Sequence, residues 1–217
     1  LASYAAGKQV GIWVWVRWSD VNNPANDWEN MRRFFSSLSK TGIRGIKIDF
    51  MDSASQERLD FYDAVAENLA KNKLMVNFHG ANTPTGEERS WPHEMSREGI
   101  YGGEQNIWAA IGGQHYCALP FTRLISGHAD FTGGYFGHGP KLRGSSWTLQ
   151  MAANIIYTSP MLHWVSNPAD MEAAFPKDSP EREVVRNIPS VWEETIVLPP
   201  SAIGECAAFA RRSGNQW

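Results

Sequence analysis

The 217-residue chain lacks the features that mark several large classes of protein. It has only two cysteines, Cys117 and Cys206, which are too few for a disulfide-built scaffold. Its 20 Lys and Arg residues do not exceed its 23 Asp and Glu residues, so no basic surface for nucleic acid is expected. No apolar run approaches the roughly 20 residues that span a bilayer. The sequence therefore indicates neither a nucleic-acid-binding protein nor a membrane span.

Aromatic residues, in contrast, are plentiful. The chain contains 10 Trp and 10 Phe, and 42% of its residues are hydrophobic, which excludes a disordered chain. So many large rings suit either a large core or a sugar-binding cleft, where ring faces stack on the C–H surfaces of a sugar.

The first part of the chain alternates between strands and helices. Apolar strands are predicted over residues 10–16, 43–50 and 74–78, with amphipathic helices between them. Asn26 and Glu29 have the spacing of a capping box at the start of the first of these helices. Repeated βα units form either a closed (β/α)₈ barrel or an open doubly wound sheet. Because no glycine-rich phosphate loop follows a strand, we favour the barrel.

The remainder of the chain is less regular. Residues 83–140 are rich in glycine, proline and aromatic residues and are expected to form long functional loops. Helices are predicted over residues 146–157 and after Ser179, and a strand over residues 206–211. A turn after that strand predicts a hairpin whose second strand begins near Trp217. We therefore expect the chain to be an internal piece of a longer protein.

Lys47 and Asp49 alternate near the end of the second predicted strand, so both side chains point to the same side of the sheet. In a barrel this side is the interior, and the chemistry lies at the carboxyl ends of the strands. A carboxylate beside an ammonium group suits a nucleophile or a stabiliser of positive charge. A structural Lys–Asp pair that seals the barrel is the alternative.

Glu98 and Glu104 bracket a short glycine-rich segment. Two such carboxylates could share a hard cation such as Ca²⁺, and one of them could act as a general acid. An isolated glutamate is, however, often a plain surface residue. His79 follows the third strand and is either a hydrogen-bonded neutral group or a ligand. Trp15 suits both a barrel core and a surface on which a sugar stacks.

Segments in order along the whole chain resemble glycoside hydrolase family 97. The motifs that carry the resemblance are Gly45-Ile46-Lys47-Ile48-Asp49-Phe50-Met51-Asp52, Asn77-Phe78-His79-Gly80-Ala81-Asn82-Thr83-Pro84-Thr85-Gly86, Arg97-Glu98-Gly99, Leu119-Pro120-Phe121-Thr122-Arg123, Asp130-Phe131-Thr132-Gly133-Gly134, Tyr157-Thr158-Ser159-Pro160, Ile188-Pro189-Ser190-Val191-Trp192-Glu193-Glu194-Thr195 and Ala207-Ala208-Phe209-Ala210-Arg211-Arg212.

The resemblance implies an architecture. Members of this family are bacterial α-glycosidases with an N-terminal β-sandwich, a catalytic (β/α)₈ barrel and a small C-terminal β domain. By that likeness, residues 1–203 form an incomplete barrel of about strands 3–8, and residues 204–217 begin the C-terminal β-sandwich domain. The isolated piece is expected to be inactive because barrel strands are missing.

The resemblance also implies site residues. Inverting members have a base glutamate where this chain has Gly80, whereas retaining members have His-Gly-Ala there and an aspartate nucleophile. This implies Asp49 as nucleophile and Glu104 as acid/base. It also implies Glu98 and Glu104 as Ca²⁺ ligands and Lys47 as a sugar contact. Trp15, near the end of the first predicted strand, and His79, directly after the third, are further expected substrate contacts.

The expected function is that of a retaining, exo-acting α-glycoside hydrolase, foremost an α-galactosidase. It would cleave α-linked oligosaccharides by double displacement through a covalent glycosyl-aspartate. Family resemblance implies a periplasmic or secreted enzyme, and no protein partner is indicated. The alternatives are an α-glucosidase of the same family, a non-catalytic sugar-binding protein, and a metal-dependent amidohydrolase-like barrel that uses Asp49, Asp52 and His79.

Overall fold

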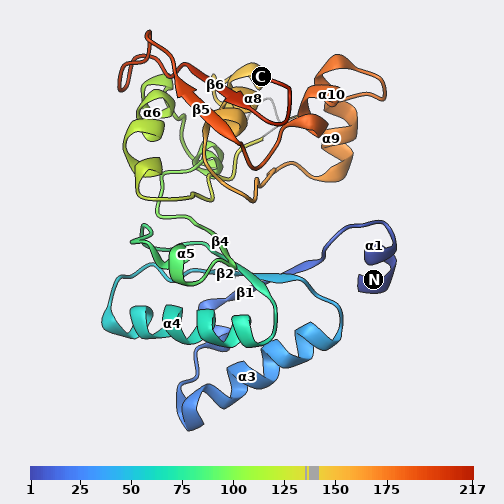
Figure 1. Ribbon diagram of the computed structural model, residues 1–217, viewed down its shortest axis with the longest axis vertical. Coiled ribbons are helices and arrows are strands. Elements are labelled where there is room, and N and C mark those ends of the chain that lie inside the picture. The colour runs from blue at the N-terminus through green and yellow to red at the C-terminus, as the bar shows by residue number, and fades with distance from the viewer. Residues whose placement is uncertain (135, 137–141) are drawn as a thin grey trace. The chain divides into compact units, whose positions relative to one another are not determined.

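The computed structural model describes residues 1–134, 136 and 142–217, which form two compact units, Leu1–Gly99 and Ile100–Trp217 (Figure 1). Residues 137–140, at the end of the expected long loops, lie outside this description. Among the described helices none combines the length and the apolar character needed to cross a bilayer.

The first unit is built on a four-stranded parallel sheet with the strand order β1-β2-β3-β4. This confirms an α/β fold with a parallel sheet, and three of the strands lie where the sequence predicts them. The fourth was not predicted, because its residues are mostly polar. The strands are β1 (Trp13–Arg17), β2 (Gly45–Asp49), β3 (Met75–Phe78) and β4 (Glu94–Arg97).

Two long helices, α3 and α4, lie along one face of this sheet (Figure 1). Ile46 and Ile48 of β2 pack there against Phe35 of α3 and Phe61 of α4, and none of the four is exposed to solvent. Burying each such side chain contributes about 1.5–3 kcal/mol. The helices of this unit are α1 (Ala2–Gly7), α2 (Trp18–Val21), α3 (Ala25–Lys40), α4 (Gln56–Lys71) and α5 (Glu87–Ser90).

The predicted capping box at the start of α3 is wrong. The helix is capped by Pro24 without a side-chain hydrogen bond, and Asn26, Asp27 and Trp28 have positive φ angles of 51°, 55° and 61°. The side-chain amide of Asn26 donates to the carboxylate of Glu29 at 3.5 Å, whereas in a capping box its oxygen would accept a hydrogen bond from the backbone N–H of Glu29. The sequence spacing is present, but the left-handed backbone removes the geometry that a capping box requires.

Within its described residues, the second unit contains short helices and an antiparallel strand pair, β5 (Glu194–Val197) with β6 (Phe209–Arg212). The predicted helices at 146–157 and after Ser179 are confirmed as α8 and α10, whose capping residues Ser146 and Ser179 accept backbone hydrogen bonds. The helical segments are η1 (Gly103–Ile107), α6 (Gly113–Ala118), η2 (Leu119–Phe121), η3 (Arg123–Ile125), α8 (Trp147–Ile156), α9 (Pro168–Ala174) and α10 (Pro180–Asn187).

The β5–β6 pair joins residues on the two sides of position 203, where the sequence places a domain boundary. That boundary stays a prediction, as does the closure of the parallel strands into a barrel.

Candidate active site

The face of the sheet opposite α3 and α4 is polar. Residues in register across parallel strands share a face, and residues two positions apart in one strand share it too. Backbone hydrogen bonds from His79 to Ile48 and from Glu98 to Phe78, both 2.8 Å, continue the ladder beyond the ends of β3 and β4. The side chains on this face form two rows, Trp15, Lys47, Asn77 and Ser96, and then Arg17, Asp49, His79 and Glu98.

Asp49 lies at the carboxyl end of β2 with 8% of its surface exposed. Its Oδ2 accepts a hydrogen bond from the indole Nε1 of Trp15 at 2.9 Å. Its Oδ1 accepts a hydrogen bond from the backbone N–H of Phe50 at 2.6 Å. Both oxygens of this carboxylate are therefore held in place.

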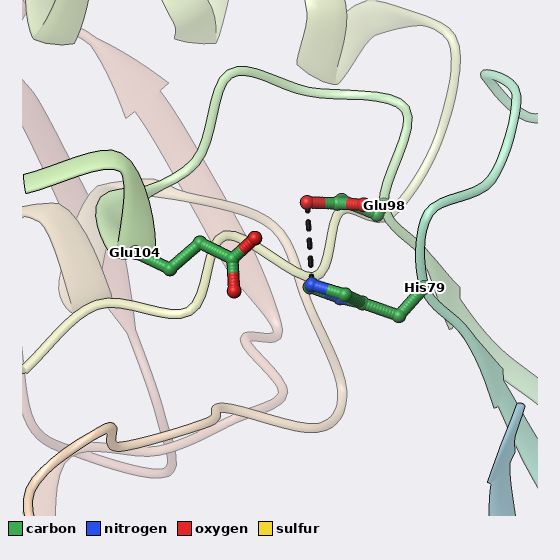
Figure 2. A group of neighbouring side chains, drawn as sticks. All are labelled: His79, Glu98 and Glu104. Carbon is green, nitrogen blue, oxygen red and sulfur yellow. Dashed lines mark ion pairs between the residues drawn. The ribbon is translucent and has the colours of Figure 1, made fainter. Parts of the chain in front are cut away.

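His79 and Glu98 form a second pair at the ends of β3 and β4. The Nε2 atom of His79 lies 3.3 Å from Oε1 of Glu98 (Figure 2), and both residues are buried. The other carboxylate oxygen, Oε2, accepts a 2.6 Å hydrogen bond from the backbone N–H of Gly80. An imidazole beside an anchored carboxylate can hold a proton or contribute ligands to a cation.

Glu104, also drawn in Figure 2, belongs to the second unit, on η1. There its backbone N–H donates to Oγ1 of Thr132 at 3.3 Å. Because few residues separate Glu104 from Glu98, the chain limits the distance between their Cα atoms to about 20 Å. The two carboxylates thus belong to one continuous stretch of chain.

Arg97, the residue before Glu98, is 1% exposed and holds the end of β4. Its Nε and Nη2 atoms donate to the carboxylate of Glu94 at 2.8 and 3.0 Å. Its Nη1 atom donates to Asn82 and Glu87, both at 3.1 Å, and so ties the segment after β3 to β4. Its guanidinium lies 4.2 Å from the ring centre of Tyr62. This cluster holds the segment of chain that joins His79 to Glu98.

The surroundings of Arg97 shift the pKa values of its neighbours. Burial raises the pKa of Glu94, although the adjacent Arg97 opposes this. Burial also acts to raise the pKa of Glu87, but hydrogen bonds to its carboxylate and the charge of Arg97 bring it below its usual value. Burial raises the pKa of Tyr62 to about 12, against the opposing charge of Arg97.

The structure thus places five of the predicted site residues on one polar face: Trp15, Lys47, Asp49, His79 and Glu98. Their catalytic and binding roles stay predictions. Sequence reasoning missed two contacts, the hydrogen bond from Trp15 to Asp49 and the pairing of His79 with Glu98. Recognising β4 would have revealed the second contact, because Glu98 then follows a strand next to the strand that His79 follows.

Comparisons with known proteins give matches to one family. Residues 1–100 match the family model described as Glycoside hydrolase 97. Over its 217 residues the chain is 35% identical to a "Probable retaining alpha-galactosidase" of Streptomyces bingchenggensis. Over 230 aligned residues it is 30% identical to the "Retaining alpha-galactosidase" of Bacteroides thetaiotaomicron. The chain is similar to members of glycoside hydrolase family 97. The resemblance noted from the sequence motifs is confirmed.

These family 97 relatives are much longer than the chain. It aligns over its whole length yet spans only 32% and 33% of the two curated relatives. A solved family 97 enzyme from Pseudoalteromonas sp. strain K8, in complexes with panose and with acarbose, has the same fold, with a TM-score of 0.84 at 22% identity. That match covers 99% of this chain and 36% of the solved one.

The high pKa of Tyr62 predicts a specific loss of stability in alkali. The folded state keeps the phenol neutral up to about pH 12, whereas an unfolded tyrosine ionises near pH 10. Its contribution to stability is therefore complete below pH 10 and declines between pH 10 and about 12. Between pH 8 and 11, urea unfolding should show that wild type loses about 1 kcal/mol more than Tyr62→Phe does.

Tyr4→Phe, which removes an exposed hydroxyl in the same unit, is the matched control. Equal losses in wild type and Tyr62→Phe would contradict the burial of an un-ionised Tyr62.

Proposed function

We propose that the complete protein is a retaining, exo-acting α-galactosidase whose strands β1–β4 belong to a (β/α)₈ barrel. The observation that carries the proposal is the Asp49 carboxylate at the carboxyl end of β2, with both oxygens held by hydrogen bonds. In such barrels, catalytic residues lie at the carboxyl ends of strands. The names of the two curated relatives and the common fold with the Pseudoalteromonas enzyme support the same assignment.

In this mechanism Asp49 is the nucleophile and Glu104 is the acid/base. An oxygen of Asp49 attacks the anomeric carbon while Glu104 donates a proton to the departing glycosidic oxygen, whose bond to that carbon breaks. A water molecule then attacks the glycosyl-aspartate, Glu104 takes the proton of that water, and the bond to Asp49 breaks. Two inversions leave the sugar in its original α configuration.

The surroundings of Gly80 support retention over inversion. Gly80 has no carboxylate and lies at a φ of 57°. A Cβ atom there would come within 2.9 Å of the backbone nitrogen of Phe50 and 3.0 Å of Oδ1 of Asp52. A glutamate base at this position would therefore have to displace the turn that follows Asp49. These contacts favour a catalytic carboxylate at position 49 over one at position 80.

We assign the sugar contacts to Lys47, Trp15 and His79, which share the polar face with Asp49. The substrate class is an α-linked oligosaccharide, in keeping with the panose and acarbose complexes of the solved relative. Hydrolysis of a panel of nitrophenyl α-glycosides by the complete protein separates the candidates. A preference for the galactoside supports the proposal, a preference for the glucoside supports the α-glucosidase alternative, and no hydrolysis supports a sugar-binding protein.

We also propose that Glu98 and Glu104, with His79, hold a Ca²⁺ ion. The two glutamates supply the hard oxygen ligands that Ca²⁺ prefers, and the Gly80 N–H already orients the carboxylate of Glu98. When bound, the cation would offset the repulsion between the two carboxylates and so allow them to approach the substrate together.

The mechanism predicts the α-anomer of the sugar as the first product. NMR of the reaction of the complete protein should show this anomer before mutarotation occurs. Asp49→Gly should lose at least about 1000-fold in turnover, because the covalent route is removed. Azide should restore turnover by giving the β-glycosyl azide. Initial release of the β-anomer would exclude retention, and with it the role of Asp49.

The cation site predicts dependence on Ca²⁺. Exhaustive chelation should lower the activity of the complete protein, and added Ca²⁺ should restore it. Glu98→Gln, which removes one ligand charge, should raise the Ca²⁺ concentration needed for half-maximal activity by about 10–100-fold. Glu67→Gln, on the exposed surface of α4, is the matched control. Full activity after chelation, with no metal found by elemental analysis, would refute the site.

A further inference from the structure

Trp15 combines an exposed ring with a buried polar contact. It lies on β1, where it pairs with Lys47 of β2. Two residues further along the strands, Arg17 pairs with Asp49. Of its surface 49% is exposed, yet its indole nitrogen donates to Oδ2 of Asp49, a residue that is 8% exposed. The indole N–H can only donate a hydrogen bond, and an ionised carboxylate can only accept one. The two groups are therefore suited to each other.

The second hydrogen bond to Asp49 depends on an unusual backbone conformation. Phe50 has a φ of 65°, in the left-handed region that residues other than glycine rarely adopt. In this conformation its N–H donates to Oδ1 of Asp49 at 2.6 Å. Such strained backbone persists where the surrounding structure enforces it, often at functional sites. One donor, Trp15, lies on β1, and the other, the N–H of Phe50, directly follows β2. Together they fix the plane of the Asp49 carboxylate.

The side chain of Phe50 also contacts the ring of Trp15. The two rings meet edge to face, with centroids 6.0 Å apart and an angle of 88° between their planes. The guanidinium of Arg17 lies 5.3 Å from the centre of the Phe50 ring. These contacts restrict the indole to the orientation in which its N–H reaches Asp49. Arg17, Phe50 and Trp15 thus form a connected support for the carboxylate.

We propose that Trp15 is a positioning residue for Asp49, a role beyond contact with the sugar. This inference rests on the proposed function, in which Asp49 is the nucleophile. Each carboxylate oxygen has a second lone pair, so the two hydrogen bonds orient the group and leave it free to bond to the anomeric carbon. Small misplacements of a reacting atom lower the rate strongly, which makes such support valuable.

The first test is Trp15→Phe in the complete protein, because this change keeps an aromatic ring, although a smaller one, and removes the N–H donor. We expect kcat on the nitrophenyl α-galactoside to fall by about 10–100-fold, the rate equivalent of one hydrogen bond to a charged group. KM should stay within about 3-fold of wild type, because substrate contacts remain. Trp13→Phe, the same change two positions earlier against Gly45, should leave kcat unchanged.

The decisive test is a double-mutant cycle with Asp49→Gly, assayed with azide as the external nucleophile. If Trp15 acts through Asp49, Trp15→Phe should change azide-supported turnover by less than about 2-fold in this background. An equal loss in both backgrounds, or a rise in KM with kcat unchanged, would overturn the positioning role and leave Trp15 as a sugar contact only. Unchanged melting temperatures would verify that the variants are folded.

The two proposals fail in different ways. If wild type hydrolyses the α-galactoside but Trp15→Phe retains full kcat and KM, only the positioning role is overturned. If wild type does not hydrolyse any α-glycoside in the panel, the proposed function itself is overturned.

Discussion

The parallel pairing of β1, β2, β3 and β4 is the constraint on which the candidate site depends. The register places Lys47 opposite Trp15 and Asn77. It also brings the row that contains Asp49 and His79 to the carboxyl edge of the sheet. A slip of one residue would turn Asp49 toward the helices and expose the apolar face. Ile46 and Ile48, fully buried against α3 and α4, make that slip costly. The hydrophobic core therefore determines where the polar groups lie.

The turns that follow β2 and β3 orient the carboxylates of the candidate site. Phe50, Asp52 and Gly80 all have positive φ angles, and the N–H of Asp52 donates to the carbonyl oxygen of Gly80 at 2.7 Å. This hydrogen bond ties the turn after β2 to the turn after β3. The same two turns provide the backbone donors to Asp49 and Glu98. Phe50 and Asp52 are thus two left-handed residues in the turn that directly follows the carboxylate of Asp49, and strained backbone of this kind often occurs at functional sites.

Much of this arrangement could be predicted from the sequence, because it follows from local periodicity. Alternation along β2 placed Lys47 and Asp49 on one face, and the apolar runs located three of the four strands. What could not be predicted depends on contacts distant in the sequence. The strand β4 is polar and is held by the buried Arg97–Glu94 pair, which no periodicity reveals. The left-handed turn at Asn26 likewise overrode a correct capping-box spacing.

The central claim is that Asp49 forms the covalent bond to the sugar, and trapping that bond tests it most directly. The complete protein would be incubated with a fluorinated α-galactoside inactivator, whose second step is slow, then digested and analysed by mass spectrometry. We predict one added fluorogalactosyl group per protein, located on Asp49 in the peptide that contains β2. An adduct on a different carboxylate, such as Asp52 or Glu104, would contradict the account.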